Sequence, residues 1–496
     1  MTSTKEEARR RGFALALICV AQFMVVLDFS IVNVALPSMQ RDLGFSTQSL
    51  QWVVSAYSLT LGGFLMLGGR LSDLYGRRLL FIFGLSLFSL ASLAGGLAPT
   101  GTFLIIARAI QGVGAALVAP AVLSLITTTF AEGPERNRAF GIVEALVSVA
   151  FAAGAILGGL LTAGPGWRWV MFVNVPIGVV AVVVTPFVLR ESRIQVAERH
   201  VDVWGALTVT AGLVALVYSL SEGNDAGWLS LQTLGLLVLA AILLGAFVLI
   251  EARTPSPLLR LGIFRQRTVT GANLVNLLLP GVVGVLIFVL TLYMQKVRDY
   301  SAIATGLAFV PIAVVTLILS NIIPRLVARR GFKFFIVWGM VVLAIGSLML
   351  AQIGVDGNYL TALLPGILVS SLGMGPAFAT VVIAGTEGVS DDEQGLASGL
   401  FNTTQQVGSG LVLAIALAIS SAHTATVLQS GTAVGKAATV AGLQYALYVC
   451  AGVALLAALI AFFVIREKKS TTIPPASSLA ENERDQHPII ISQRSS

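Results

Sequence analysis

The chain has 496 residues, of which 56% are hydrophobic and only 11% are charged, and its mean hydropathy is +0.89. Soluble globular proteins carry about 25% charged residues, so this composition excludes a soluble protein and indicates an all-α integral membrane protein in a lipid bilayer. The formal net charge of +7 comes from short basic clusters between long apolar blocks, which argues against a partner of the nucleic-acid class.

Residues 1–12 are polar and basic, and we expect them to form a cytoplasmic N-terminus. A basic run followed by an apolar run imitates a secretory signal peptide, but no small-residue cleavage site follows, so we expect the first helix to be retained. Each later apolar block is long enough to cross a hydrocarbon core of about 30 Å. We predict fourteen spans, over residues 13–36, 50–69, 79–98, 102–127, 138–163, 168–189, 203–221, 230–251, 268–295, 302–323, 333–353, 360–385, 396–420 and 440–465.

An even number of spans places both termini on the same side of the membrane. The segments on that side hold most of the 31 Lys and Arg residues. Because cytoplasmic loops are enriched in Lys and Arg, we expect a multi-pass protein of the cell membrane with both termini in the cytoplasm. The tail, residues 466–496, is polar and contains proline, and we predict it to be disordered. Loops on the opposite side contain few basic residues, namely Arg41, Arg168, Lys296, Arg298 and Lys436.

Two loops of the sequence resemble one another. "GRLSDLYGRR" (69–78) follows the second span, and "PRLVARRGFK" (324–333) follows the tenth. Chance similarity of two basic loops is one explanation. We favour duplication of a six-helix unit, as in many transporters, because each loop follows the second helix of its set. The expected organisation is an N-terminal six-helix bundle, a linker with two extra transmembrane helices and a C-terminal six-helix bundle, over 13–189, 190–267 and 268–465 respectively.

The first of these loops resembles the loop motif of the major facilitator superfamily, with Leu74 in place of the motif's Arg. Four further segments, in spans one, four, six and thirteen, resemble the fourteen-helix drug:proton antiporters of that superfamily; they read "LDFSIVNVALP", "RAIQGVG", "WRWVMFVNVPIG" and "GLASGLFNTTQQVGSGLVLAI". The resemblance covers residues ~13–465. It implies the major facilitator fold and alternating access between two six-helix halves.

Asp28 is a carboxylate in an otherwise apolar span, where an ionised group requires a partner, water or a function. At about 1.5 Å per residue it lies roughly 24 Å from the cytoplasmic end of span one. Arg108, in the antiparallel span four, falls at a similar depth, so the two can interact. A static pair that fixes helix packing is one interpretation. The other is that Asp28 gains and loses a proton, and the resemblance implies that Arg108 is the coupling arginine of the family.

Glu144 lies about six residues from the cytoplasmic end of span five. A carboxylate so shallow can reach water or pair with a loop arginine such as Arg136 or Arg138. Its alternative role is a second proton or cation site in the inward-facing cavity, and the resemblance does not decide between these roles.

Several uncharged polar residues lie inside the spans. Hydrogen bonds between helices explain such residues in general. On the family's architecture the first and seventh helices of the repeat line the cavity, which makes some of them, together with Asp28, candidates for substrate binding. These candidates are Asn33, Gln111, Asn273 and Asn276.

Span five contains a glycine segment in which Gly154, Gly158 and Gly159 give a smooth helix face that another helix can approach closely. The segment resembles the glycine motif of the antiporters, but Ala150 replaces a motif Gly and Ala155 replaces the motif Pro. A proline would bend the helix, so its absence leaves antiport and symport both open.

The loop after span two supplies candidates for a conformational switch, namely Gly69, Asp73, Gly76, Arg77 and Arg78. The two glycines allow a tight turn, and Asp73 suits a helix N-terminus. The resemblance implies that Asp73 latches the N-terminal half onto span thirteen. Acidic residues before that span, at 391–393, could pair with the two arginines, although acids are also common at helix starts.

The sequence gives no sign of an enzyme. Its three histidines lack metal-ligand spacing, and it has no nucleotide-binding or nucleophile motif, so we expect no metal, no cofactor and a proton gradient as the energy source. We predict a monomeric proton-coupled exporter of amphipathic, cationic drugs or antibiotics. The alternatives are a dedicated exporter of one endogenous metabolite and a proton-coupled symporter.

Overall fold

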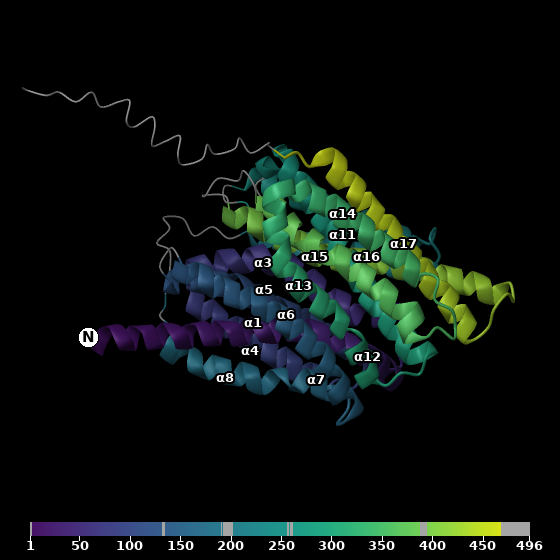
Figure 1. Ribbon diagram of the computed structural model, residues 1–496, viewed down its shortest axis with the longest axis horizontal. Helices are drawn as coiled ribbons and strands as arrows, with labels where there is room; N and C mark the ends of the chain where they lie inside the picture. Colours follow the sequence, from purple (N-terminus) through teal and green to yellow (C-terminus); the bar gives the residue numbers. More distant parts are fainter. Residues whose placement is uncertain are drawn as a thin grey trace, which may run out of the picture.

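The computed structural model describes residues 2–130, 134–189, 191, 202–254, 257, 261–386 and 394–467, and within these ranges it contains helices and no strand. The helices form two bundles that lie side by side (Figure 1). The N-terminal half consists of α1 (Thr2–Leu43), α2 (Thr47–Leu50), α3 (Trp52–Tyr75), α4 (Arg77–Gly96), α5 (Gly101–Thr129), α6 (Pro134–Ala163), α7 (Arg168–Phe172) and α8 (Asn174–Val188).

Two extra helices follow, α9 (Val203–Ala226) and α10 (Leu231–Arg253), and then the 3₁₀ turn η1 (Leu261–Arg265). The C-terminal half consists of α11 (Arg267–Leu292), the π-helical turn η2 (Tyr293–Val297), α12 (Ala302–Ala308), α13 (Val310–Arg330), α14 (Phe332–Leu350), the π-helical turn η3 (Tyr359–Leu363), α15 (Leu364–Thr386), α16 (Gln394–Gln429) and α17 (Lys436–Val464).

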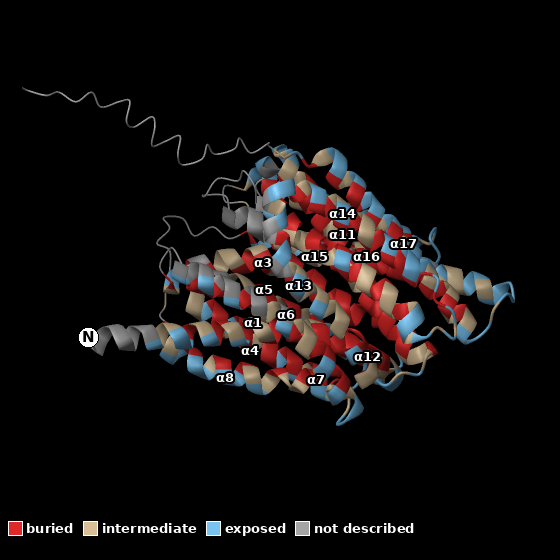
Figure 2. Cartoon of the chain, viewed as in Figure 1, coloured by how far each residue is buried: buried red, intermediate tan, exposed pale blue. Residues whose placement is uncertain are grey.

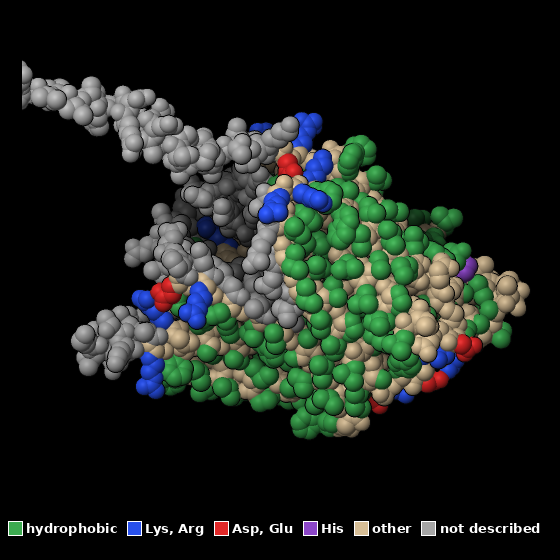
Figure 3. Space-filling model, viewed as in Figure 1, with side chains coloured by type: hydrophobic (Ala, Val, Ile, Leu, Met, Phe, Trp, Pro, Cys, Tyr) green, Lys and Arg blue, Asp and Glu red, His purple; other side chains and the backbone are tan. Residues whose placement is uncertain are grey.

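All fourteen predicted spans coincide with helices. Among the described residues, 12 helices are long and apolar enough to cross a membrane, and two shorter apolar segments cover Val149–Ala163 and Ala302–Thr316. Apolar side chains cover the sides of the molecule in Figure 3, and the coloured charges gather toward its two ends. Since a lipid-exposed backbone must satisfy its hydrogen bonds internally, this all-helical arrangement confirms the predicted membrane fold class. Spans two, six, nine, ten and twelve are each divided into two helical pieces.

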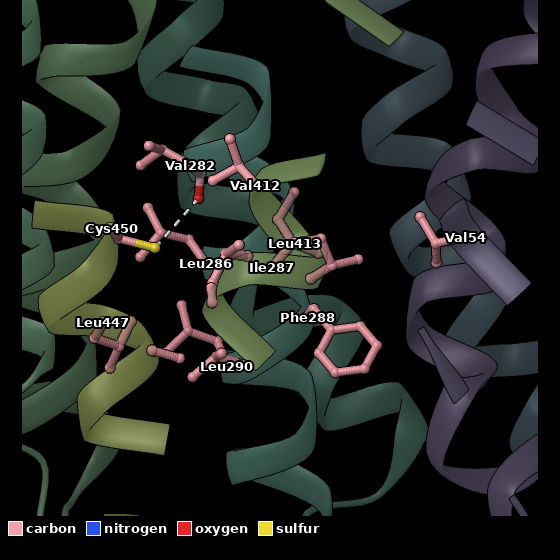
Figure 4. Packing of buried hydrophobic residues seen from close by; sticks show 14 of the residues in the cluster. Val54, Val282, Leu286, Ile287, Phe288, Leu290, Val412, Leu413, Leu447 and Cys450 are labelled. Carbon is pink, nitrogen blue, oxygen red and sulfur yellow. Dashed lines mark hydrogen bonds between the residues drawn. The ribbon is translucent and has the colours of Figure 1, made fainter. Parts of the chain in front are cut away.

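Both halves have dense interiors, shown in red in Figure 2. In the N-terminal half, side chains such as Met24, Phe81 and Phe88 are fully buried between α1, α4 and α5. In the C-terminal half, Leu447 and Cys450 of α17 pack against α11 (Figure 4). The cluster around Leu447 and Cys450 continues into the N-terminal half through residues such as Ile31 and Val54, so the two halves share part of their buried interior.

Matching contacts occur at the start of the third helix of each half. Glu191, which follows α8, accepts hydrogen bonds from the backbone N–H groups of Arg78 and Leu79 at 3.1 and 3.2 Å. Glu467, which follows α17, accepts from the backbone N–H of Lys333 at 2.9 Å. A carboxylate is favourable at a helix N-terminus because the free N–H groups carry partial positive charge. The equivalent placement of the two acids supports the internal repeat.

The two halves contact each other along α3 and α16, where a Cβ added to Gly62 would lie 2.9 Å from Cβ of Gln406, and also at the end of the molecule opposite the end where α1 begins. There Nε2 of Gln295, on η2, donates to the carbonyl of Val34, on α1, at 2.9 Å. A Cβ added to Gly159 of α6 would lie 2.7 Å from the carbonyl oxygen of Ala302 on α12. Between the two halves, the end where α1 begins is hollowed (Figure 3). We call the contacting end the closed end and the other the terminal end.

The extra helices attach along one side of this seam, where α9 contacts both α3 and α16. Gln51 of α3 donates a hydrogen bond to Ser221 of α9, and the rings of Trp52 and Tyr218 lie 5.9 Å apart. Apolar side chains, among them Val217 of α9 and Val407 of α16, form the contact with the C-terminal half. The polar attachment of α9 is thus to the N-terminal half.

Candidate functional site

Asp28 lies on α1 and faces the interior of the N-terminal half. Its Oδ2 accepts a hydrogen bond from Nη1 of Arg108, on α5, at 2.5 Å, and the two side chains are 0% and 1% exposed. The structure therefore brings together the two charges that the sequence placed at equal depth. The pair is enclosed in one half, and Asp28 does not reach the space between the halves in this conformation.

The second oxygen of Asp28 is held by two side-chain amides. Oδ1 accepts from Nε2 of Gln111, on α5, and from Nδ2 of Asn174, on α8, each at 2.8 Å. The same two amides donate to Oγ of Ser92, on α4, at 3.3 and 3.1 Å. Ser92 in turn donates to the backbone carbonyl of Met171, on α7, at 2.9 Å. Five helices thus converge on one carboxylate.

Arg108 is fixed on several sides. Its Nε donates to the backbone carbonyl of Val53, on α3, at 2.9 Å, and its Nη1 also donates to Oε1 of Gln111 at 2.7 Å. The guanidinium lies over the ring of Tyr57, 4.3 Å from the ring centre. Because a charged group buried in a membrane protein is costly unless it is paired and hydrogen-bonded, these contacts explain how the pair persists in the bundle interior.

The arrangement balances one buried negative charge against one buried positive charge, and hydrogen bonds hold both oxygens of the carboxylate. A rearrangement of α1 against α5 would open this network, because the two charges lie on those two helices.

The other candidates for substrate binding fall into two places. Asn33, on α1, is 5% exposed and donates to the carbonyl of Phe29 within its own helix. Asn276 of α11 donates to the carbonyl of Phe401 on α16 at 2.6 Å. Asn273, also on α11, accepts from Thr404 of α16. Asn273 and Asn276 therefore join two helices of the C-terminal half, and Gln111 belongs to the Asp28 cluster.

The three glycines of span five lie at helix contacts. A Cβ added to Gly154 would lie 3.0 Å from the carbonyl oxygen of Leu27 on α1, and one added to Gly158 would lie 2.8 Å from that of Ile31. These two glycines therefore let α6 approach the helix that carries Asp28, which confirms the predicted close approach. Gly159 faces α12 of the other half instead. The carbonyl of Ala155, the residue that replaces the motif Pro, abuts Gly306 of α12.

The loop residues form a turn between α3 and α4. Gly76 has a φ of +116°, a conformation suited to glycine, and a Cβ there would lie 2.5 Å from Oε1 of Glu191. The Nε of Arg78 lies 3.7 Å from Oε2 of Glu191, so its described carboxylate partner is in its own half. Gly69 lies against Pro120 of α5 at an ordinary distance.

Some candidates cannot be placed. The side chains of Asp73 and Glu144 lie outside the described residues, as do residues 387–393 before α16 and the tail from 468 onward. The predicted Asp73 latch, the pairing of Arg77 and Arg78 with the acidic segment, and the role of Glu144 thus remain predictions.

Sequence reasoning missed Ser92, Asn174 and Tyr57 of the Asp28 cluster, and the helix-capping acids Glu191 and Glu467. Asn174 lies inside a segment that had drawn attention only as a family resemblance. The two acids had a usable signal, because "LRES" and "IREK" end the sixth span of each half with an apolar residue, Arg and Glu. Ser92 and Tyr57 are ordinary residues in apolar helices, and the fold alone reveals their position.

Comparison with known proteins gives a consistent result. The sequence matches the Major Facilitator Superfamily over residues 18–413. It is 40% identical over 464 residues to puromycin resistance protein pur8 of Streptomyces alboniger, which covers 92% of this chain and 92% of that relative. It is 40% identical over 414 residues to cephamycin export protein CmcT of Amycolatopsis lactamdurans, covering 83% of this chain and 85% of the relative.

A solved structure shares the fold. A bacterial homolog of the human lysosomal transporter Spinster, in an inward-facing and unoccupied conformation, superposes with a TM-score of 0.65 at 15% sequence identity. The superposition covers 92% of this chain and 97% of that chain. At this identity, the likeness establishes the fold alone.

Proposed function

The chain belongs to the Major Facilitator Superfamily, and on that premise we propose that it is a proton-coupled exporter of amphipathic drugs or antibiotics. The observation that carries the coupling is the buried pair of Asp28 and Arg108, enclosed by hydrogen bonds in the N-terminal half. A membrane-embedded ionisable residue points to proton or ion handling because an unpaired charge is costly there. The sequence contains no nucleotide-binding motif, so an ion gradient supplies the energy.

The proposed orientation is compatible with export. Basic loops place both termini in the cytoplasm, so the hollow at the terminal end faces the cytoplasm and the closed end faces outward. In this conformation the exporter would be ready to take substrate from the cytoplasm. Asp28 would take up a proton when the closed end opens, and would release it inward as the pair with Arg108 re-forms. One proton crossing 100 mV supplies about 2.3 kcal/mol.

The proposed substrates are amphipathic drug-type molecules, because one relative at 40% identity is named for resistance to puromycin and another for export of cephamycin. We propose a cationic group because the membrane-embedded candidate Asp28 is acidic. The Asp28 pair does not itself contact such a cation in the described conformation, since both side chains are buried. A cationic substrate would reach Asp28 only when Arg108 has moved. The polar groups of α1 and α11, namely Asn33, Asn273 and Asn276, are further proposed contacts. One chain contains both halves, so we propose a monomer.

A second candidate function is export of one endogenous metabolite. It is supported by the second relative, which is named for the export of cephamycin. A symporter remains the other alternative, because Ala155 replaces the proline of the antiporter motif.

The test is efflux from cells that express the wild type or Asp28→Asn, with ethidium and puromycin as separate probes. We expect active efflux by the wild type, its collapse on addition of a protonophore, and its loss in Asp28→Asn at equal expression. Thr185→Val, a buried change on α8 whose hydroxyl contacts only its own helix, serves as a matched control. Protonophore-sensitive efflux that survives in Asp28→Asn would contradict coupling through Asp28. Absence of efflux of both probes would favour the single-metabolite exporter.

A further inference from the structure

The groups that surround Asp28 are all hydrogen-bond donors. Oδ2 faces an N–H of Arg108, and Oδ1 faces the NH2 groups of Gln111 and Asn174. A carboxylate accepts hydrogen bonds at both oxygens, whereas a protonated carboxyl must also donate one. The cluster as it stands is therefore complementary to ionised Asp28, and it offers a protonated Asp28 no acceptor.

Most of the cluster cannot be rearranged to supply that acceptor. Oε1 of Gln111 already accepts from Nη1 of Arg108 at 2.7 Å, so turning this amide would point its NH2 group at the guanidinium. The hydroxyl of Ser92 donates its hydrogen bond to the carbonyl of Met171, and its oxygen accepts hydrogen bonds from the amides of Gln111 and Asn174. Neither Gln111 nor Ser92 can therefore offer an acceptor to Asp28 without giving up another hydrogen bond, and Arg108 has only donors. One member of the cluster differs.

The exception is Asn174. Its side chain is 0% exposed, and its Oδ1 has no hydrogen-bond partner among the described residues. Rotation of this amide by half a turn about its Cβ–Cγ bond would exchange Oδ1 and Nδ2, and would bring an acceptor to Oδ1 of Asp28. The hydroxyl of Ser92, which now accepts from Nδ2, would then turn from the carbonyl of Met171 and donate to the exchanged oxygen. When Asp28 is ionised, the rotated amide would place Oδ1 of Asn174 against Oδ1 of Asp28, and two acceptors repel each other. The charge state of Asp28 therefore selects the orientation of the amide.

We propose that Asn174 is a proton-coupling residue whose amide donates to Asp28 when the carboxyl is ionised and, after rotation, accepts from it when it is protonated. This inference rests on the proposed function in taking Asp28 as the proton carrier. Among the described residues, the charged or titratable groups that face Asp28 are Arg108 from α5 and Tyr57 from α3. Helices α4 and α8 contribute the uncharged Ser92 and Asn174.

The test is a pH titration of the purified full-length protein in detergent, followed through the infrared carbonyl band of the protonated carboxyl. Subtraction of the Asp28→Asn spectrum assigns that band to Asp28. In Asn174→Leu, which keeps the branched shape and the number of side-chain heavy atoms but neither donates nor accepts, we expect the midpoint to rise by about half to one pH unit. The rise follows because the lost hydrogen bond to a charged group is worth more than one to a neutral group. The band should also move to higher frequency, because the protonated carboxyl loses its acceptor.

Two further variants separate this role from a structural one. Asn174→Ser replaces the amide by a hydroxyl, which can both donate and accept. We therefore expect smaller changes in midpoint and band position than in Asn174→Leu. Thr185→Val, on the same helix, should leave both unchanged. A wild-type midpoint and band position in Asn174→Leu would overturn the inference, as would equal changes in Thr185→Val.

The same titration distinguishes failure of the inference from failure of the proposed function, because it requires no substrate. If neither probe is exported but the band shifts as expected, the role of Asn174 stands and the assigned substrates are wrong. If Asp28→Asn removes no titrating band, Asp28 is not the proton carrier, and the inference falls with it.

Discussion

Nη1 of Arg108 and Oδ2 of Asp28 lie 2.5 Å apart inside the N-terminal half, not in the space between the halves. On the proposed function, this position would separate proton handling from substrate contact. A substrate in the space between the halves would act on the pair through movement of α1 and α5, whereas direct displacement of Arg108 would require the helices to part. Predictions about the pair therefore concern stability as well as transport.

Arg108→Gln should strongly destabilise the protein, because it leaves Asp28 buried without a counter-charge. Breaking a buried pair in this way typically costs about 3–5 kcal/mol. The double variant Asp28→Asn/Arg108→Gln removes both charges and should recover much of this stability without recovering proton-coupled export. Thermal unfolding in detergent, together with protonophore-sensitive efflux, checks both expectations. Equal destabilisation in the single and double variants would show that the ion pair itself is not the source of the loss.

Gly306→Val should prevent the closed end from forming. The carbonyl of Ala155, on α6, abuts the position that a Cβ at Gly306 would occupy, so a larger side chain would force the two halves apart. A single cysteine at position 295, in a variant without Cys19 and Cys450, would report this opening through faster reaction with an impermeant maleimide. Gly245→Val, on α10, is the control because no atom lies within 4 Å of its Cβ position. Unchanged labelling in Gly306→Val would contradict a closed end held by α6 and α12.

Glu191→Gln and Glu467→Gln should each lower the stability of the protein by about 1 kcal/mol, because each loses charge–dipole and hydrogen-bond stabilisation at a helix start. The two sites lie in different halves, so the effects should add in the double variant. Unfolding temperatures of the single and double variants measure this directly. A large loss in only one of them would show that the two halves do not use the acids in the same way.

The spans could be predicted from the sequence because lipid imposes a long apolar run on every crossing helix. The Asp28–Arg108 pair was also accessible, since depth along antiparallel helices follows from counting residues. The contact of Asn174 with Asp28 could not be predicted, because it follows only from the position of α8 beside α1 in the fold. The breaks between α7 and α8 and between α12 and α13 were likewise hidden, since both pieces of each span are equally apolar.

The partner of Arg78 could not be predicted from the sequence for a different reason. Charge alone suggested acids of the other half, at 391–393, as partners for the arginines of the loop. In the structure, Glu191 of the same half contacts Arg78 and the backbone beside it. Sequence separation gave no reason to prefer an acid more than a hundred residues away over any other, and only the duplicated "RE" after the sixth span of each half hinted at it.

Tyr57→Phe and Tyr57→Leu should have opposite consequences for the buried pair. The ring of Tyr57 lies against the guanidinium of Arg108, whereas its hydroxyl is buried and has no hydrogen-bond partner within the described part of the chain. Phenylalanine keeps the cation–π contact and removes the unpaired hydroxyl, so we expect Tyr57→Phe to unfold at the same or a higher temperature than the wild type. Leucine removes the aromatic face, and a desolvated cation–π contact is worth about 2 kcal/mol. Thermal unfolding of both variants in detergent distinguishes them, and an equal fall in unfolding temperature in Tyr57→Phe and Tyr57→Leu would assign the role to the hydroxyl instead.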